Sequence, residues 1–298
     1  MQKRYDKITG EYLYHTKHPS GLDIYIMPRE GFRSSYAIFA TRYGSVDSKF
    51  IVPGEDKVTE VPDGIAHYLE HKMFDQPDGS NIFDKFSQLG ANANAFTSFN
   101  MTAYLFSAAD NVCENLEVLL DYVQAPYFTP ESVQKEQGII GQEIKMYDDN
   151  APWRVFFNLL GCLYHNHPVK LDIAGTVESI AKIDSDLLYK CYNTFYNLSN
   201  TAIFVTGNLD ADKTLEVIER SIKTNEPAQG EIGRIYPDEP DTVAKKICEQ
   251  EISVAQPIFM LGWKDTDVGY GGRRLMKKSI EMDILCEMLF GKSGELYN

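Results

Sequence analysis

Apolar and polar residues alternate along this chain with the two periods that distinguish strands from helices. A period of two, typical of strands that bury one face, runs through residues 22–26 and 35–43. Residues 91–100 lead into 101–107 and predict two further strands around a polar turn. The apolar run 201–206 predicts a strand that is buried.

Helical periodicity follows these strands. After a polar loop over 54–62, Asp63 is expected to cap a helix, because the apolar residues from Ile65 to Met73 recur every four positions. Pro130 is well placed to begin a second helix, which should end near Tyr147. Five more helices are predicted over residues 81–89, 111–124, 152–164, 184–196 and 210–223.

The order of these elements indicates an α+β fold. Strands and helices are mixed without the regular alternation of a parallel α/β protein. The sequence therefore predicts a mainly antiparallel sheet with helices packed on one face, which is a two-layer sandwich.

The composition changes near residue 225 and suggests a division into domains. Residues 1–224 would form a first domain, and 225–243, rich in Pro, Gly, Glu and Asp, would form a linker. Residues 244–298 resemble the start of a second copy, with a strand expected over 257–265 and a helix over 273–290. So short a domain rarely holds a core of its own, so we expect the chain to be part of a longer protein.

Composition and charge exclude several classes of function. With 298 residues, of which 43% are hydrophobic, the chain can bury a large core. Its net charge of -14 argues against nucleic acid as a partner. It has no apolar run near the ~20 residues that cross a bilayer, and its first residues lack a signal-like apolar stretch. Five widely spaced cysteines without a C-x-x-C pair favour reduced thiols and a cytoplasmic location.

The strongest chemical signal is His-x-x-Glu-His within Gly64–Phe74. Its three polar residues, His67, Glu70 and His71, occupy positions i, i+3 and i+4, which share one face of a helix. The two imidazoles can then bind one metal ion, with the carboxylate beside them. This spacing is the inverted form of the zinc-binding motif of metallopeptidases.

A catalytic zinc site generally needs a third protein ligand, which must come from another segment. Glu143 is the best candidate, and Glu136 lies seven residues earlier, close to two helical turns, so the two carboxylates share a face. One could bind the metal and the other could orient a ligand histidine. His165 and His167 form an i, i+2 pair beside a proline, and a loop with a packing role is the favoured interpretation.

A site of two histidines and one glutamate suits Zn²⁺. Zinc lowers the pKa of a bound water towards ~7, and Glu70 would accept the water proton and later deliver one to the leaving amine. The predicted reaction is hydrolysis of an amide bond.

These residues resemble the pitrilysin/insulinase family of zinc metallopeptidases, the inverzincins. The resemblance implies that His67, His71 and Glu143 bind zinc, that Glu70 is the general base and that Glu136 supports the site. It also implies a fold like that of mitochondrial processing peptidase. The matching segments are Gly64–Phe74, residues 90–97, 136–143 and 165–175, and the pair Gly207-Asn208.

The resemblance also implies how a peptide would bind. Asn94, Ala95 and Phe96 match an edge strand that pairs with the substrate backbone, and Phe74 would line the same cleft. Family members close two similar halves over an unfolded peptide, and the second half often supplies an Arg and a Tyr that lie beyond this chain. More narrowly, the chain resembles bacterial members associated with elongation factor P modification, which implies a homodimer or a heterodimer with a relative that lacks the motif.

Two other functions remain open from the sequence. The chain could be a non-catalytic peptide-binding subunit in which zinc is structural, although such a site has no need of Glu70 as a base. It could also be a metal-dependent lyase acting on a thioether, which would need a cysteine in the pocket. No cysteine lies near the motif in the sequence.

Overall fold

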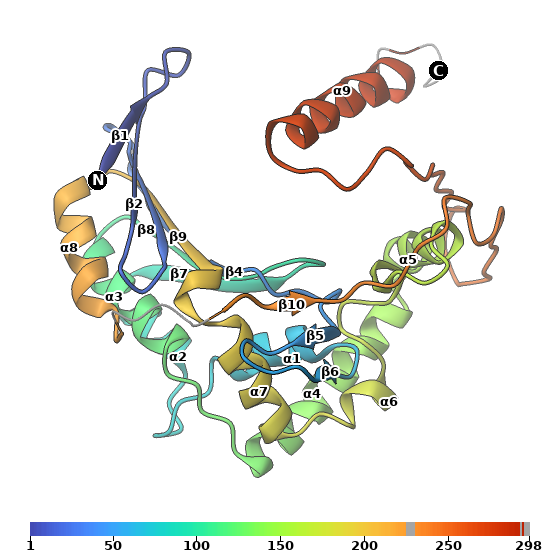
Figure 1. Cartoon of the computed structure of the whole chain (residues 1–298), viewed down its shortest axis with the longest axis horizontal. Coiled ribbons are helices and arrows are strands. Elements are labelled where there is room, and N and C mark those ends of the chain that lie inside the picture. Colours follow the sequence, from blue (N-terminus) through green and yellow to red (C-terminus); the bar gives the residue numbers. More distant parts are fainter. Residues whose placement is uncertain (225–229, 293, 295–298) are drawn as a thin grey trace. The chain divides into compact units, whose positions relative to one another are not determined.

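The computed structural model of the chain describes residues 1–224, 230–292 and 294. The chain forms two compact units, Met1–Leu261 and Gly262–Asn298. The first unit contains the central sheet and the motif helix, and the second contains one long helix (Figure 1).

A seven-stranded sheet forms the centre of the first unit (Figure 1). Its order is β1-β2-β3-β9-β4-β8-β7, and every neighbouring pair is antiparallel except β3 and β9. The mainly antiparallel sheet expected from the sequence is confirmed, with β7 at one edge. The strands are β1 (Gln2–Tyr5), β2 (Tyr12–Lys17), β3 (Asp23–Pro28), β4 (Ser35–Thr41), β7 (Ala91–Thr97), β8 (Thr102–Ala108) and β9 (Thr201–Gly207).

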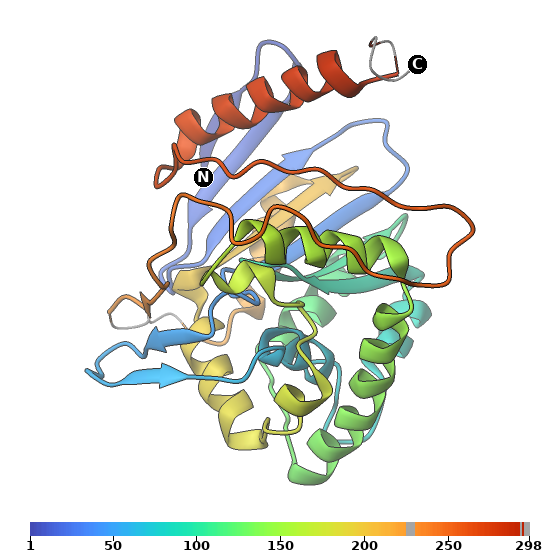
Figure 2. The ribbon, with the colours of Figure 1, turned by 90° about the vertical axis from the view of Figure 1, so that its right-hand side faces the viewer.

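The core lies between one face of this sheet and a layer of helices. Ala37 and Phe39 of β4 are buried, whereas Ile38 between them is half-buried, because successive side chains of a strand point to opposite faces. The buried face packs against apolar helix residues such as Leu69 and Leu116. The turned view in Figure 2 shows the sheet and the helices as two layers, as the sequence predicts.

Most predicted helices are confirmed, and several of them begin at a side-chain cap. The Asn81 side chain accepts a hydrogen bond from the Phe83 N–H (3.0 Å), and Thr129 accepts one from the Ser132 N–H (3.2 Å) ahead of a helix that begins with Pro130. The helices of the first unit are α1 (Ile65–Lys72), α2 (Ile82–Gln88), α3 (Val112–Val123), α4 (Pro130–Asp148), α5 (Ala151–Leu163), α6 (Val177–Ile180), α7 (Ser185–Phe195) and α8 (Ala211–Ser221), with 3₁₀ turns η1 (Pro168–Lys170) and η2 (Leu198–Asn200).

A second, three-stranded sheet corrects the expected polar loop over 54–62 and adds a strand inside the predicted linker. Its order is β10-β5-β6, formed by Gly233–Arg234, Lys49–Ile51 and Val58–Glu60. Strand β6 lies within the expected polar loop over 54–62, and β10 lies within the predicted linker over 225–243. Strands this short carry no readable periodicity, so only their pairing with β5 reveals them.

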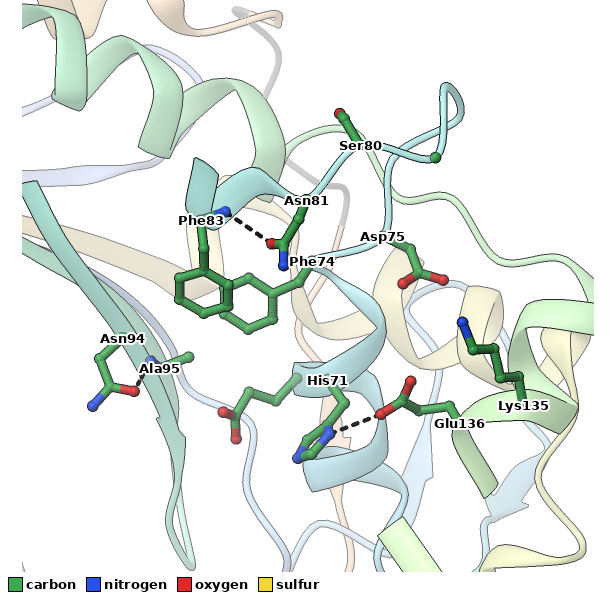
Figure 3. A pocket seen from close by; sticks show the side chains of 12 residues that line it. His71, Phe74, Asp75, Ser80, Asn81, Phe83, Asn94, Ala95, Lys135 and Glu136 are labelled. Atoms are coloured by element: carbon green, nitrogen blue, oxygen red, sulfur yellow. Dashed lines mark hydrogen bonds and ion pairs between the residues drawn. The ribbon is translucent and has the colours of Figure 1, made fainter. Parts of the chain in front are cut away.

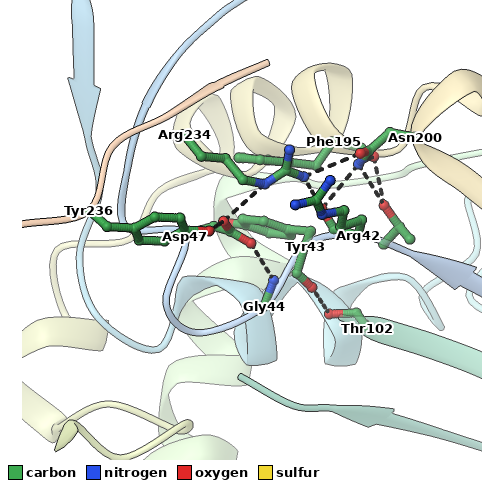
Figure 4. Close-up of polar contacts among 10 residues, drawn as sticks. Arg42, Tyr43, Gly44, Asp47, Thr102, Phe195, Asn200, Arg234 and Tyr236 are labelled. Carbon is green, nitrogen blue, oxygen red and sulfur yellow. Dashed lines mark hydrogen bonds and ion pairs between the residues drawn. The ribbon is translucent and has the colours of Figure 1, made fainter. Parts of the chain in front are cut away.

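A buried ion pair fixes the middle of the predicted linker, around Arg234, to the rest of the first unit (Figure 4). The Asp47 carboxylate is buried and accepts hydrogen bonds from the Arg234 Nε (3.1 Å), the Tyr236 hydroxyl (2.8 Å) and the Gly44 N–H (3.0 Å). The Arg234 guanidinium also donates to the Asn200 side chain (3.2 Å). Residues 225–229 of the predicted linker lie outside the described residues, and the first compact unit continues to Leu261. The division at 224 and 244 stays a prediction.

The second unit consists mainly of helix α9 (Gly272–Phe290), which confirms the helix predicted over 273–290. The strand expected over 257–265 is wrong, because these residues are irregular and pair with no neighbouring strand in the described part of the chain. Phe259 and Trp263 are 83% and 70% exposed instead of being buried on a sheet. Among the described residues, no helix is both long and apolar enough to span a membrane.

Candidate metal centre

Helix α1 presents the two histidines of the motif, but it begins one residue later than expected. Its N-cap is Gly64 with φ 90°, not Asp63, and no side chain caps this end. A glycine is required here because a Cβ at Gly64 would overlap the Ala174 carbonyl oxygen in the loop before α6. The left-handed turn therefore lets α1 begin in close contact with that loop.

Helix α4 brings a carboxylate to the face of α1 that carries the histidines. Nε2 of His67 lies 3.7 Å from one oxygen of Glu143, and Nε2 of His71 lies 3.4 Å from the other. The potential ligand atoms of the three residues all lie within 4.8 Å of one another. Tetrahedral ligands at zinc bonding distances are separated by roughly 3.3 Å, so this nitrogen–nitrogen–oxygen set fits zinc with little movement.

Glu136 lies behind the histidines and orients one of them. Its carboxylate pairs with Nδ1 of His71 at 3.0 Å, so Nδ1 acts as the donor and the Nε2 lone pair is left facing Glu143. Burial opposes a charge on His71, but the bond to Glu136 and the nearby carboxylates outweigh it and raise the His71 pKa. Burial likewise opposes a charge on Glu136, but the bond from His71 outweighs it and lowers the Glu136 pKa.

His67 is held in its neutral form by its surroundings. Burial, reinforced by the neighbouring His71, lowers the pKa of His67 to about 3. A neutral imidazole is the form that binds a metal ion, because a protonated ring has no free lone pair. The Nε2 lone pair of His67 is therefore available to a metal ion at neutral pH without the loss of a proton.

Glu70 lies on the same helix but does not join the ligand group. The residue is only 7% exposed, and its carboxylate accepts a hydrogen bond from the Thr97 hydroxyl of β7 (2.6 Å). Burial raises the Glu70 pKa, although the Thr97 bond partly offsets this rise. A fixed carboxylate of raised basicity beside a metal site can accept a proton from water.

The strand that carries Thr97 is the open edge of the sheet. Strand β7 pairs with β8 on one side only, and Asn94 and Phe96 are exposed whereas Ala95 is half-buried against the core. The Ala95 N–H donates to the Asn94 side chain at this exposed edge (2.9 Å). The three residues Asn94, Ala95 and Phe96 thus lie where an extended chain could pair with β7, and their role in binding stays a prediction.

A cavity of about 500 Å³ adjoins this edge and the motif helix (Figure 3). Glu70, His71 and Glu136 line one part of it, and Phe74 and Phe83 line another. The two phenylalanine rings are stacked, with centroids 4.5 Å apart. The predicted position of Phe74 beside the site agrees with this arrangement.

Several residues of the site escape sequence reasoning. Thr97 and Phe83 reach Glu70 and Phe74 only through tertiary contacts, and no local pattern marks them. Tyr147 donates a hydrogen bond to Glu143 (2.8 Å), and its position one turn further along α4 was a usable signal. Burial and the neighbouring Glu143 raise the Tyr147 pKa to about 12, so this hydroxyl remains a donor.

The other candidate ligands lie elsewhere. Among the described residues, only one group of three or more His, Cys, Asp or Glu side chains is close enough to hold a metal ion, and it consists of His67, His71 and Glu143. His165 and His167 lie in a loop that packs against residues 236–242, where the His167 ring stacks on Tyr236 with centroids 5.8 Å apart. The packing interpretation of these two histidines therefore agrees with the structure.

Comparison with protein families matches nearly the whole chain. Residues 57–177 match the insulinase family (peptidase family M16), and residues 182–298 match the inactive domain of peptidase M16. The first match contains the motif, Glu136 and Glu143, and the second contains none of the candidate ligands.

Individual relatives agree with the family match. A Bacillus subtilis protein named "Uncharacterized zinc protease YmfH" is 49% identical over 96% of this chain and 67% of its own length. A second, named "Uncharacterized zinc protease YmxG", is 29% identical over 74% of this chain and 54% of its own length. The solved structure of an M16-like peptidase from Alicyclobacillus acidocaldarius superposes with a TM-score of 0.91 and 42% identity, covering 96% of this chain and 67% of that one. The chain thus spans about two thirds of the length of the first relative and about half of the second.

Proposed function

The chain belongs to the insulinase family (peptidase family M16), and from this membership and the geometry of its site we propose that it is the zinc-binding part of an endopeptidase. Its substrates would be short or unfolded peptides. The observation that carries this proposal is the convergence of His67, His71 and Glu143 beside a buried, oriented Glu70.

His67, His71 and Glu143 would hold the zinc ion, with Glu136 fixing the tautomer of His71. Bound zinc supplies a Lewis acid that lowers the pKa of water and polarises a carbonyl oxygen. The donor set supports zinc because two imidazoles and a carboxylate match its usual ligands in hydrolases.

Glu70 would act as the general base. It accepts a proton from the attacking water and then delivers a proton to the leaving amine, which completes hydrolysis without net proton loss. The hydrogen bond from Thr97 keeps the carboxylate on the side of α1 that faces β7. The raised pKa of Glu70 supports both transfers, because an ordinary carboxylate is a weaker base near neutral pH.

The open edge of β7 would bind the substrate backbone by strand addition. Only an extended segment can pair in this way, which is why the proposed substrates are short or unfolded. One substrate side chain would enter the cavity beside the stacked Phe74 and Phe83 rings. Exposed Phe96 would contact the chain next to it.

The whole protein's partners remain part of the proposal. Because the chain spans about two thirds of its first relative, the rest of the peptide chamber would come from outside these residues. A homodimer or a heterodimer with a family member that lacks the motif would complete it. A cytoplasmic location is likewise proposed, on the basis of the five free cysteines.

Hydrolysis of a quenched fluorescent peptide by the full-length zinc-loaded protein tests the proposal. Glu70→Gln keeps the size of the side chain and the ligand set, so we expect unchanged zinc content and a rate lowered by about 10² to 10⁴-fold. Glu131→Gln, on the exposed first turn of α4, is the matched control and should retain the wild-type rate. Equal rates for Glu70→Gln and wild type would refute Glu70 as the base.

The two alternative functions have less support. A purely structural zinc site has no need of a buried carboxylate fixed by Thr97 beside the ligands. A thioether lyase would need a cysteine, and within the described residues no cysteine lines the cavity beside Glu70.

A further inference from the structure

The carboxylate of Glu143 is fixed by a neighbour on its own helix. The Tyr147 hydroxyl, one turn further along α4, donates to Oε1 of Glu143 at 2.8 Å. Oε1 is the oxygen nearest His67 (3.7 Å), and Oε2 is the oxygen nearest His71 (3.4 Å). The hydrogen bond from Tyr147 therefore selects the rotation of the carboxylate that directs one oxygen at each histidine.

Tyr147 is itself held by an aromatic stack. Its ring lies on the Trp153 indole, with centroids 4.6 Å apart and planes 16° apart. Trp153 comes from the first turn of α5 and also contacts the Phe157 ring (5.1 Å). Stacking of this kind restricts the tyrosine ring to one orientation, so its hydroxyl stays directed at Glu143.

The indole is anchored in turn by a carboxylate from another loop. The Trp153 Nε1–H donates to Oδ2 of Asp172 at 2.5 Å. The other Asp172 oxygen accepts the Ala174 N–H at 3.0 Å, and the Asp172 carbonyl accepts the Gly175 N–H at 3.0 Å. Asp172 thus links the indole to a tight turn over 172–175.

That turn packs directly on the start of the motif helix. A Cβ at Gly64 would overlap the Ala174 carbonyl oxygen, and a Cβ at Gly175 would overlap the Asp63 carbonyl oxygen. The Ser179 hydroxyl also donates to the Asp63 carbonyl (2.8 Å). The start of α1 is thus connected to Glu143 by a continuous series of contacts: α1 packs on the turn, the turn binds Trp153, Trp153 stacks on Tyr147, and Tyr147 bonds to Glu143. Glu143 in turn faces the two histidines of α1.

We propose that Tyr147, Trp153 and Asp172 form a positioning relay that holds Glu143 in register with the histidines of α1 before a metal ion binds. The inference rests on the proposed zinc site and adds residues outside the motif to it. Because the ligand is already oriented, less conformational freedom is lost when the ion binds. Removing groups that orient a metal ligand typically weakens metal binding by about 10- to 100-fold.

The direct test is the zinc affinity of the purified protein, measured by competition with a chromogenic chelator. Tyr147→Phe removes only the hydroxyl, so we expect zinc affinity to fall about 10-fold, with the melting temperature of the metal-free protein unchanged. Tyr192→Phe is the matched control, because that hydroxyl donates to the Val123 carbonyl (2.8 Å) away from the site and its loss should leave zinc affinity unchanged.

A double-mutant cycle tests whether Trp153 acts through Tyr147. Trp153→Phe removes the indole N–H and should weaken zinc binding several-fold in the wild-type background, but add little in the Tyr147→Phe background. Unchanged zinc affinity in Tyr147→Phe, additive losses in the cycle, or an equal loss in Tyr192→Phe would each overturn the relay. A wild-type protein that binds no zinc would overturn the proposed metal site itself, whereas wild-type binding with an unaffected Tyr147→Phe overturns the relay alone.

Discussion

The Thr97–Glu70 hydrogen bond should set the acid limb of the pH–rate profile. Thr97→Val replaces the hydroxyl by a methyl group of similar size and removes the bond to Glu70 (2.6 Å). The bond lowers the pKa of Glu70, because it stabilises the ionised carboxylate more than the protonated one. Its loss must therefore raise the Glu70 pKa above its already raised value.

The size of the effect follows from the burial of Glu70, which is 7% exposed and cannot recover the lost bond fully from water. A hydrogen bond to a charged group contributes about 1.5–3 kcal/mol. One pKa unit corresponds to about 1.4 kcal/mol, so the Glu70 pKa should rise by about 1–2 units. The base must be deprotonated to act, so the acid limb of kcat/KM should move to higher pH by the same amount.

The assay is peptide hydrolysis by the full-length zinc-loaded protein, followed across the acid limb. The rate of Thr97→Val should approach that of wild type on the alkaline side and fall about 10- to 100-fold below it on the acidic side. Thr206→Val is the matched control, because the Thr206 hydroxyl bonds the Met27 carbonyl (2.8 Å) in the sheet, away from the site. An acid limb at the same pH in Thr97→Val and wild type would refute the assignment of that limb to Glu70.

Three further predictions concern the metal, the strand edge and the fold. Zinc affinity, measured by chelator competition between about pH 5.5 and 8, should fall with decreasing pH, because the raised pKa of His71 lets a proton compete with the metal for that ring, whereas His67, with a pKa near 3, takes up no proton in this range. An affinity that does not change with pH over this range would contradict the reasoning. Ala95→Pro removes an N–H at the open edge of β7, so KM for peptides should rise while zinc content is unchanged, and an unchanged KM would argue against strand addition. Asp47→Ala leaves the mostly buried Arg234 without its carboxylate (the Asp47 and Arg234 side chains are 1% and 12% exposed), so urea unfolding should show a loss of about 3–5 kcal/mol. A loss below about 1 kcal/mol would show that this pair does not fix the segment around Arg234 to the first unit.

Much of the helical layer was predictable because its signals are local. Asn81 and Thr129 cap the helices that follow them, and Pro130 occupies the first turn where its missing N–H costs nothing. The start of α1 was missed because Gly64, rather than the polar Asp63, satisfies a steric demand from the distant Ala174 loop. A contact across that separation leaves no trace in the neighbouring sequence.

The same distinction between local and tertiary signals separates the predicted from the unpredicted parts of the site. The i, i+3, i+4 spacing placed His67, Glu70 and His71 on one helical face, and the seven-residue spacing placed Glu136 and Glu143 on another. Residue type and spacing made Glu143 the best candidate for the third ligand, and the family resemblance implied the same role, but no local pattern shows how α4 packs on α1. Thr97 and Trp153 act only through side chains from other elements, so they became visible with the tertiary structure.

The segment around Arg234 shows what composition alone cannot predict. Its Pro, Gly and acidic residues are typical of solvent-exposed connections. However, its two-residue strand pairs with β5, and its arginine reaches a buried carboxylate. Composition describes the average of such a segment and misses the few residues that anchor it.

Anomalous diffraction at the zinc absorption edge, from crystals of the zinc-loaded protein, would locate the metal relative to His67, His71 and Glu143. We expect a single strong peak at bonding distance, about 2.0–2.2 Å, from Nε2 of His67, Nε2 of His71 and a carboxylate oxygen of Glu143. A peak at another position, or one at the histidines with Glu143 turned away, would contradict it.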